Sequence, residues 1–388
     1  MKTTPRPPKA LIILSITAFI GQFTISMINL ALVYYLRIQF SLSPQMIGLS
    51  VALYTTSYFF SCFLVDPIAS KISPSHSVQI SQIGMLLSIL FILLTSDIQL
   101  VFLALILYGF FMAFLWPQLA AWITRGKEGP DLSRSTGAFN VSWSLGAALS
   151  PLLTGVLVET SSRVPLYLSF FLFLLVVILL TISSALVKEM KKVISEHTRR
   201  KTYQSIDRST PLRYVSWIGN LTLYIALAVI LTIFPLYALD SLPFSKSGVG
   251  FLLFVRGMST VIVFHLLGIS KWWHFNKKAI ALTLISFSLI SLIATQISSF
   301  LMYSLFFIAF GALFATMYTF SIFHGVSGSI HRSKRMLIHE ALLTIGTIIG
   351  STLGGALYQR FGFSQVLYMC ALMVLFPLIL LFVQHMKK

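Results

Sequence analysis

Long apolar stretches dominate this chain, and short polar segments separate them. Each stretch has about 20 residues, the length that an α-helix needs to cross the hydrocarbon core of a bilayer. Backbone groups in lipid must be paired within their own segment, so each stretch is expected to be helical throughout. The pattern predicts twelve such helices, at 10–36, 46–66, 77–95, 98–122, 137–158, 164–187, 212–238, 247–268, 278–297, 299–324, 338–358 and 364–384.

The amino-acid composition agrees with this interpretation. Apolar residues make up 57% of the chain and charged residues only 10%, whereas soluble domains are about a quarter charged. The expected fold class is therefore an all-α polytopic membrane protein. The first stretch follows a basic segment, as in a signal peptide, but it is too long for a signal sequence and is kept as the first helix.

The net charge of +18 could indicate binding to nucleic acid, but its placement indicates a membrane topology instead. Of the 28 Lys and Arg residues, only Arg37, Arg163, Lys246 and Arg360 lie in loops after odd-numbered stretches, and Arg256 lies within a stretch. The others lie in or beside the terminal segments and the loops after even-numbered stretches. Because positive charge is retained on the cytoplasmic side, we expect a cytoplasmic-membrane protein with both termini inside and no nucleic-acid partner.

Residues for catalysis or metal binding form no recognisable motif. Cys62 and Cys370 both lie in apolar stretches and cannot build a disulfide framework or a metal cluster. The sequence contains no HExxH, GxSxG or P-loop motif. We therefore expect neither an enzyme nor a cofactor. His265, His324 and His339 are expected at the membrane interface, and Pro117 is expected to kink the fourth helix.

Two predicted helices carry a stripe of polar side chains at helical spacing. In the first helix the stripe is Gln22, Ser26 and Asn29, and in the seventh it is Ser216, Asn220 and Tyr224. Such groups are costly in lipid unless they are paired or wet, so they either hydrogen-bond to neighbouring helices or line a central cavity. The recurrence of the stripe in equivalent helices favours the cavity.

Two charges within the predicted spans are candidates for function. Arg256 lies about midway along the eighth helix, where a charge normally faces a water-filled cavity or a partner. Glu340 lies near the start of the eleventh helix, where it either couples protons or favours the helix dipole and pairs with Arg335. The candidate substrate-binding residues are Arg256, Gln22, Ser26, Asn29, Asn140, Trp143, Asn220 and Tyr224, with Glu340 as the candidate for proton coupling.

Small residues recur through the predicted fifth helix at Gly137, Gly146, Ser150-Pro151 and Thr154-Gly155, and small residues let helices approach closely in lipid. A second series, Gly346, Gly350, Gly354 and Gly355, follows about 200 positions downstream. The first series resembles the fifth-helix antiporter motif of the major facilitator superfamily, with Ser150 and Thr154 where that motif has Gly. The loop after the second helix resembles another motif of that family through Asp66 and Lys71, although Cys62, Ala69 and Ser70 depart from it. Without the resemblance, this loop is a basic cytoplasmic loop with an Asp at a helix end.

The resemblance implies two six-helix halves, 1–187 and 212–388, which repeat about an axis along the membrane normal. A basic cytoplasmic linker, 188–211, joins them. It also implies alternating access through rocking of the halves around a substrate site near the midplane. In that picture the glycine-rich fifth and eleventh helices slide against partners from the opposite half. The implied gating and packing residues are Gly137, Gly146, Pro151, Gly155, Gly346, Gly350, Gly354, Gly355, Asp66 and Lys71.

Three functions are compatible with these features. In the family the fifth-helix motif is associated with proton-coupled efflux, so the first expectation is export of a small molecule against proton entry. Because carboxylates within the spans are scarce, the second is uptake or exchange of an organic or phosphorylated anion centred on Arg256. The third is a membrane binding protein that transports nothing. The expected partners are a small-molecule substrate, the lipid bilayer and protons as coupling ion, and we expect a monomer.

Overall fold

The computed structural model describes residues 9–69, 71–124, 129–186 and 209–386. In this part of the chain the regular structure is helical, and twelve helical spans are long and apolar enough to cross a membrane. The predicted all-α polytopic fold is confirmed. Most of the predicted linker, 188–211, lies outside the described residues.

The helices fall into two consecutive groups. The first group is α1 (Lys9–Gln39), α2 (Pro44–Ala69), α3 (Pro74–Leu94), α4 (Ile98–Met112), α5 (Trp116–Thr124), α6 (Gly129–Thr160) and α7 (Val164–Leu186). The second group is α9 (Leu212–Ala228), the π-helical turn η1 (Val229–Ile233), α10 (Phe234–Ser241), α11 (Lys246–Ile269), α12 (Lys277–Ala294), α13 (Phe300–Val326), α14 (Arg332–Phe361), α15 (Phe363–Met373) and α16 (Leu375–Met386).

Most helices begin and end within a few residues of the predicted ranges, but α6 and α14 begin well before their apolar stretches. The eleventh helix was predicted to start at 338, whereas the corresponding helix α14 begins at Arg332. The reason is that apolar residues mark only the part of a helix that crosses lipid. The residues before 338 include Arg, Lys, Met and Leu, which are good helix formers and extend the helix beyond that part.

Three spans are interrupted about four residues before a proline. The predicted kink at Pro117 is a break between α4 and α5 at 113–115. Pro235 follows the π-helical turn η1, and Pro377 follows the break between α15 and α16. Proline removes one backbone hydrogen bond and its ring clashes with the carbonyl group four residues earlier, which explains the position of each break.

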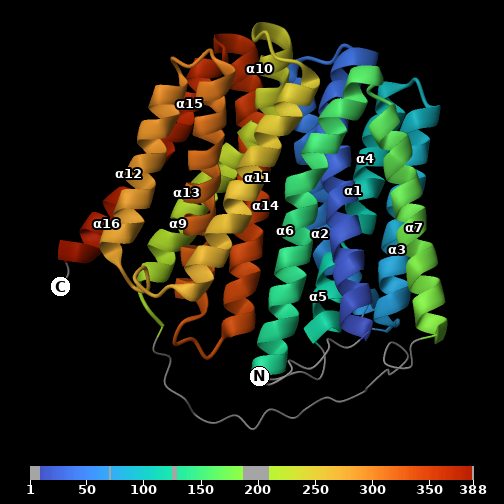
Figure 1. Cartoon of the computed structure of the whole chain (residues 1–388), viewed down its shortest axis with the longest axis horizontal. Helices are drawn as coiled ribbons and strands as arrows, with labels where there is room; N and C mark the ends of the chain where they lie inside the picture. Colours follow the sequence, from blue (N-terminus) through green and yellow to red (C-terminus); the bar gives the residue numbers. More distant parts are fainter. Residues whose placement is uncertain (1–8, 70, 125–128, 187–208, 387–388) are drawn as a thin grey trace, which may run out of the picture.

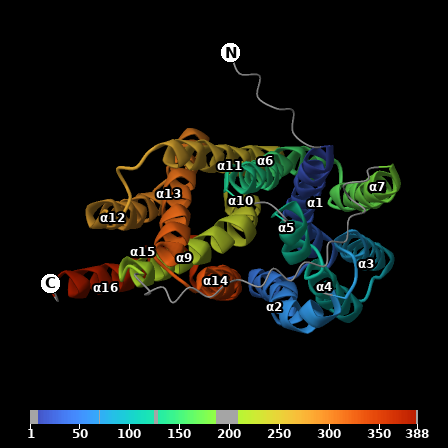
Figure 2. The ribbon, with the colours of Figure 1, turned by 90° about the horizontal axis from the view of Figure 1, so that it is seen from below.

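The two groups form two bundles that lie side by side (Figures 1 and 2). Each bundle contains a buried cluster of apolar side chains, and each cluster also includes a few residues of the other bundle. The most extensive contacts between the bundles are those of α6 with α11 and of α2 with α14, and α1 also contacts α10. We call the end of the molecule at which α1 and α6 begin the lower end, and the end at which α1 finishes the upper end, as in Figure 1.

Candidate functional site

A cavity of about 190 Å³ lies between the two bundles. Its walls come from α1 and α6 on one side and from α9, η1, α11 and α13 on the other. The polar and aromatic side chains in the wall are Gln22, Ser26, Asn29, Trp143, Ser144, Tyr224, Arg256, Thr260, Phe264, Phe314 and Tyr318. The cavity therefore collects residues from both halves of the chain, as a site at the repeat interface requires.

Arg256 is the charged residue in this wall. Its side chain is only 7% exposed. Among the described residues its guanidinium group has no hydrogen bond or ion pair, and its Nε atom is buried and unpaired. The neighbouring Gly257 packs directly against Ala148 of α6, which holds this part of α11 close to the first bundle. A buried cation without a partner is costly, so this position is suited to a ligand that brings the opposite charge.

The α1 side of the cavity carries uncharged amide and hydroxyl groups. The Nε2 atom of Gln22 donates a hydrogen bond to Ser26 at 3.0 Å. The Tyr54 hydroxyl of α2 donates to the Oδ1 atom of Asn29, also at 3.0 Å. These bonds hold the two amide groups, and the Nδ2 atom of Asn29, a residue that lines the cavity, remains able to donate.

An aromatic cluster stands beside Arg256 in the second bundle. The ring of Tyr224 lies 5.2 Å from that of Phe314 and 6.3 Å from that of Tyr318, and Phe264 lies 5.5 Å from Tyr318. Tyr224 is also within electrostatic reach of Arg256. Aromatic rings of this kind supply apolar contact area to a small ligand. Phe314 and Tyr318 were not predicted, because in an apolar stretch nothing distinguishes a lining aromatic residue from a packed one.

Two predicted substrate-binding residues do not line this cavity. Asn220 is fully buried within the second bundle. Asn140 is exposed near the lower end of α6, where it accepts a hydrogen bond from Trp143 Nε1 at 3.2 Å. Gln22, Ser26, Asn29, Trp143, Tyr224 and Arg256 do lie in the cavity wall. The structure thus brings six of the eight candidates together.

Glu340 lies more than two turns into α14, because that helix begins at Arg332. A favourable interaction with the helix dipole is confined to the first turn, so it does not explain this residue. Glu340 is exposed, and it is within electrostatic reach of Tyr58, Tyr224 and Tyr318. The Arg335 guanidinium group lies 5.7 Å from the ring centroid of Trp217.

The small residues of α6 and α14 divide into two sets. A Cβ atom at Gly146 would meet the backbone of α1, and one at Gly346 or Gly350 would meet α9, so these glycines pack within their own bundle. The Ser150 hydroxyl, at a position where the family motif has Gly, donates to the Phe23 carbonyl group of α1 at 2.7 Å. These contacts correct the expectation that the whole glycine face slides against the opposite half.

The second set does cross between the bundles. A Cβ atom at Gly155 would meet Lys246 and Gly250 of α11, and one at Gly355 would meet Pro44 and Gln45 of α2. Gly354 packs against Val229 in its own bundle, and the Pro151 carbonyl faces Gly250. Gly137 has no atom within 4 Å of its Cβ position, so a packing role for it is wrong in this structure.

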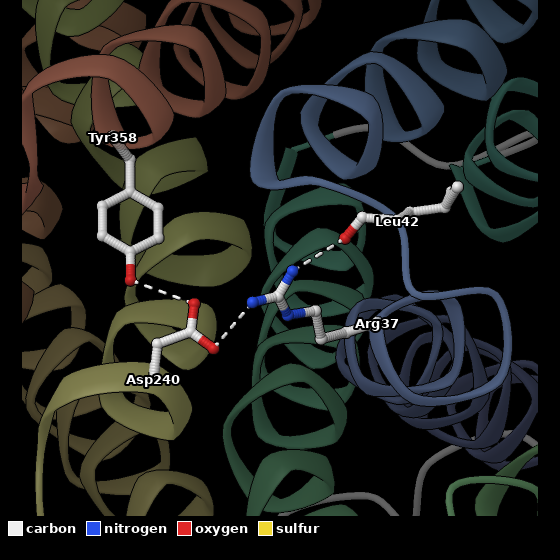
Figure 3. Close-up of polar contacts among 4 residues, drawn as sticks. All are labelled: Arg37, Leu42, Asp240 and Tyr358. Atoms are coloured by element: carbon white, nitrogen blue, oxygen red, sulfur yellow. Dashed lines mark hydrogen bonds and ion pairs between the residues drawn. The ribbon is translucent and has the colours of Figure 1, made fainter.

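Hydrogen bonds close the upper end of the molecule. Arg37, near the end of α1, forms an ion pair of 3.1 Å with Asp240 of α10, and Tyr358 of α14 donates to the same carboxylate at 3.2 Å (Figure 3). Arg37 also donates to the Leu42 carbonyl group. Three elements from both bundles therefore meet at one carboxylate.

Two further contacts at this end repeat with a period of 200 residues. Glu159, at the end of α6, accepts hydrogen bonds from the Ser247 backbone and hydroxyl at the start of α11. Gln359, at the end of α14, accepts from the Gln45 backbone at the start of α2. Each side chain satisfies a free N–H group in the first turn of a helix of the opposite bundle. This pairing supports the internal repeat that the glycines suggested.

The lower end is arranged differently. On the facing helices α6 and α14, Gly137, Asn140, Leu337 and Glu340 are exposed. The bundles thus meet at the upper end and expose these helix faces at the lower end. Lys71 is exposed at this end, whereas the side chain of Asp66 lies outside the described residues.

Two histidines that we expected at the membrane interface are buried inside the second bundle. The Nδ1 atom of His324 is 2.7 Å from the Ser216 hydroxyl, and that of His339 is 2.8 Å from the Ser321 hydroxyl. Both side chains are almost fully buried. His265 is exposed. The bonds join α9, α13 and α14, so these two histidines belong to the interior of the bundle.

A family profile and several solved structures match this chain. The profile of the Major Facilitator Superfamily matches residues 14–330. No curated protein matches the chain. Similar solved structures include a peptide transporter, POT, with a TM-score of 0.76 and 13% identity, covering 97% of this chain and 94% of that one.

Two further solved structures are similar over nearly their whole length. The nucleoside transporter NupG has a TM-score of 0.76 and 12% identity, covering 98% of this chain and 100% of that one. A bacterial homolog of the human lysosomal transporter Spinster, in an inward-facing and occupied conformation, has a TM-score of 0.72 and 14% identity, covering 99% and 98%. At these identities the likeness establishes the fold alone.

Proposed function

The chain belongs to the Major Facilitator Superfamily and is a membrane transporter of that type, and we propose that its substrate is a small organic anion bound at Arg256. The observation that carries this proposal is the state of that guanidinium group. It is buried in the wall of the cavity between the bundles and has no protein partner among the described residues. A carboxylate or phosphoryl group on the substrate would pair with it in a charge-assisted, bidentate geometry.

We further propose that transport proceeds by alternating access across the cytoplasmic membrane, with both termini in the cytoplasm. The distribution of Lys and Arg supports this orientation. In this orientation the lower end faces the cytoplasm. The structure then corresponds to a state whose outer end is closed by the contacts among Arg37, Asp240 and Tyr358. Opening the upper end would require these polar contacts to break.

A proteoliposome assay tests the anion proposal. Purified protein, Arg256→Gln and Arg360→Gln would be compared for uptake of radiolabelled organic and phosphorylated anions, sugars, nucleosides and lipophilic cations. Arg360 is an exposed arginine at the end of α14, so its variant controls for loss of one positive charge. We expect anion uptake by the wild type and by Arg360→Gln, and at least a tenfold loss of affinity in Arg256→Gln. Unchanged anion affinity in Arg256→Gln would overturn the proposal.

A second candidate function is proton-coupled export, which Glu340 favours. This carboxylate is exposed on α14 and lies within electrostatic reach of Tyr224 and Tyr318 in the cavity wall. A carboxylate whose surroundings change between conformations can bind a proton in one state and release it in the other. In this reading Glu340 would link proton entry to exit of the substrate.

Inverted vesicles with a pH-sensitive dye would test this second function. Substrate-induced dissipation of an imposed proton gradient is expected in the wild type and in Asp97→Asn, and not in Glu340→Gln. Asp97 is a suitable control because it caps α4, and Asn caps helices equally well. Anion exchange that leaves the gradient unchanged in the wild type would exclude proton coupling.

A further inference from the structure

The cavity has two chemically different walls, and they restrict the substrate more narrowly than Arg256 alone does. Arg256 is the charged residue among the lining residues, and the lining contains no carboxylate. Glu340 lies outside the wall. An ammonium group on the substrate would therefore find no carboxylate in the lining and would be repelled by Arg256, and a second anionic group would remain uncompensated in a site of low dielectric constant. The charge of the wall is suited to a single negative charge.

The opposite wall offers hydrogen bonds without charge. Gln22 and Asn29 on α1 are held by their bonds to Ser26 and to Tyr54. Because the Asn29 Oδ1 atom already accepts from Tyr54, its Nδ2 atom remains as a donor. The Trp143 Nε1 atom is already bonded to Asn140, so Trp143 offers the cavity only its ring. This wall is suited to a hydroxyl or carbonyl oxygen.

The space between the walls is suited to a single ring. A dry cavity of roughly 150 Å³ accepts a benzene molecule, and this cavity measures about 190 Å³. Tyr224, Phe314 and Tyr318 supply aromatic surface beside Arg256. The apolar body of the substrate would pack on these rings, with a polar group at each end.

From these walls we infer that the substrate is a monoanion with a one-ring apolar body and an uncharged hydrogen-bonding group at the far end. Its anionic group pairs with Arg256 in the second bundle, and its neutral group bonds to Asn29 in the first. One molecule then contacts both bundles, so its presence favours the state in which both walls are close. This inference rests on the proposed role of Arg256, and Tyr54 acts as a positioning residue for the Asn29 amide.

A series of matched single-ring compounds tests the inference by isothermal titration calorimetry on the full chain at pH 7. The probes are 4-hydroxyphenylacetate, which has both polar ends, phenylacetate, which lacks the neutral one, tyrosine, tyramine and the dianion 1,4-phenylenediacetate. We expect 4-hydroxyphenylacetate to bind best, with about tenfold higher affinity than phenylacetate, which is the effect of one hydrogen bond in a buried site. Tyrosine, tyramine and the dianion should bind at least tenfold more weakly than 4-hydroxyphenylacetate.

Variants separate this inference from the proposed function. In Asn29→Leu the affinity ratio between the two monoanions should fall from about tenfold to near one, and in Tyr54→Phe it should fall partly. The exposed Gln296 serves as control, and Gln296→Leu should keep the wild-type ratio.

Three results would overturn the inference. They are a ratio near one in the wild type, an unchanged ratio in Asn29→Leu, and binding of tyramine, tyrosine or the dianion as tight as that of 4-hydroxyphenylacetate. If both monoanions bind equally and both require Arg256, the inference fails while the anion proposal stands. If no monoanion binds and Arg256→Gln has normal uptake, both fail.

Discussion

The helices α1 and α9 open the two bundles and carry polar side chains at similar spacing, yet their polar stripes face different surroundings. Gln22, Ser26 and Asn29 of α1 all line the cavity between the bundles. Of the polar stripe on α9, Tyr224 lines that cavity, whereas Ser216 and Asn220 are fully buried inside the second bundle. The stripe of α1 is thus available to a substrate, whereas two of the three residues in the stripe of α9 are buried away from the cavity.

The difference shows that the second bundle contributes to the cavity by other means. Its charged group in the wall is Arg256 of α11, and aromatic side chains of α9 and α13 lie in the same wall. Ser216 instead bonds to His324. The two bundles are therefore alike in backbone and unlike in chemistry, which gives the cavity one neutral wall and one cationic wall.

What α1 and α9 share is their contact with glycine-rich helices. Gly146 of α6 packs on the backbone of α1, and Gly346 and Gly350 of α14 pack on α9. The largest expected effect comes from breaking this common feature. Gly350→Leu would place a side chain on the Ile225 carbonyl oxygen and should destabilise the protein by about 3 kcal/mol or more.

Thermal unfolding in detergent measures this effect, with Gly137→Leu as the matched control. Gly137 has open space around its Cβ position, so its replacement should leave the melting temperature nearly unchanged. Equal melting temperatures for the two leucine variants would contradict the close contact between α14 and α9.

A smaller effect should distinguish a serine of each stripe. Ser216→Ala leaves the buried His324 Nδ1 atom without its partner, which should reduce the free energy of unfolding by about 1–3 kcal/mol. Ser26→Ala removes a hydroxyl group that faces the cavity, so its effect on unfolding should be within about 0.5 kcal/mol. Chemical denaturation of both variants checks this. A larger loss of unfolding free energy in Ser26→Ala than in Ser216→Ala would contradict the assignment of Ser216 to an internal contact and of Ser26 to the cavity wall.

For substrate affinity, unlike stability, the larger effect should come from the stripe of α1. Gln22→Leu removes an amide from the cavity wall and should weaken substrate binding by about five- to tenfold. Asn220→Leu replaces a fully buried amide, whose side-chain atoms have no protein partner among the described residues, with an apolar group of similar size. It should leave affinity unchanged, and unfolding should become no easier. Equal losses of affinity in titrations of the two variants would mean that both stripes face the substrate.

The smallest expected effect on stability comes from an ion pair at the upper ends of α1 and α10. Arg37 of α1 pairs with Asp240 of α10, which continues the span of α9, and both side chains are partly exposed. Surface ion pairs contribute only about 0–1 kcal/mol and are screened by salt. Arg37→Gln should therefore leave unfolding almost unchanged and shift the population toward opening of the upper end.

Distances between spin labels on the upper ends of α1 and α10 would detect that shift. In the wild type, high salt should shift the distances in the same direction as Arg37→Gln does, but by less. A distance distribution that is unaffected by either the substitution or salt would show that this ion pair does not hold the upper end closed.

Several elements of the site could be predicted from the sequence and others could not. The depth of Arg256 followed from its position within an apolar stretch, because a charge there needs a cavity or a partner. The predicted start of α14 was wrong, since polar residues extend the helix beyond the part that crosses lipid. Glu340 therefore lies more than two turns into the helix, where the helix dipole does not explain it. Phe314 and Tyr318 carried no signal that separates a lining residue from a packed one.

The sequence by itself determined the twelve membrane-crossing helices and the repeated glycines. Each helix depends on a local requirement, namely enough consecutive apolar residues to cross the lipid with every backbone group paired. Only the tertiary structure decided which polar residues meet in the cavity. Gln22 and Asn220 are both amides in polar stripes, but the rotation of a helix about its own axis depends on how its neighbours pack against it. In this structure Gln22 lies in the cavity wall, whereas Asn220 is buried inside the second bundle.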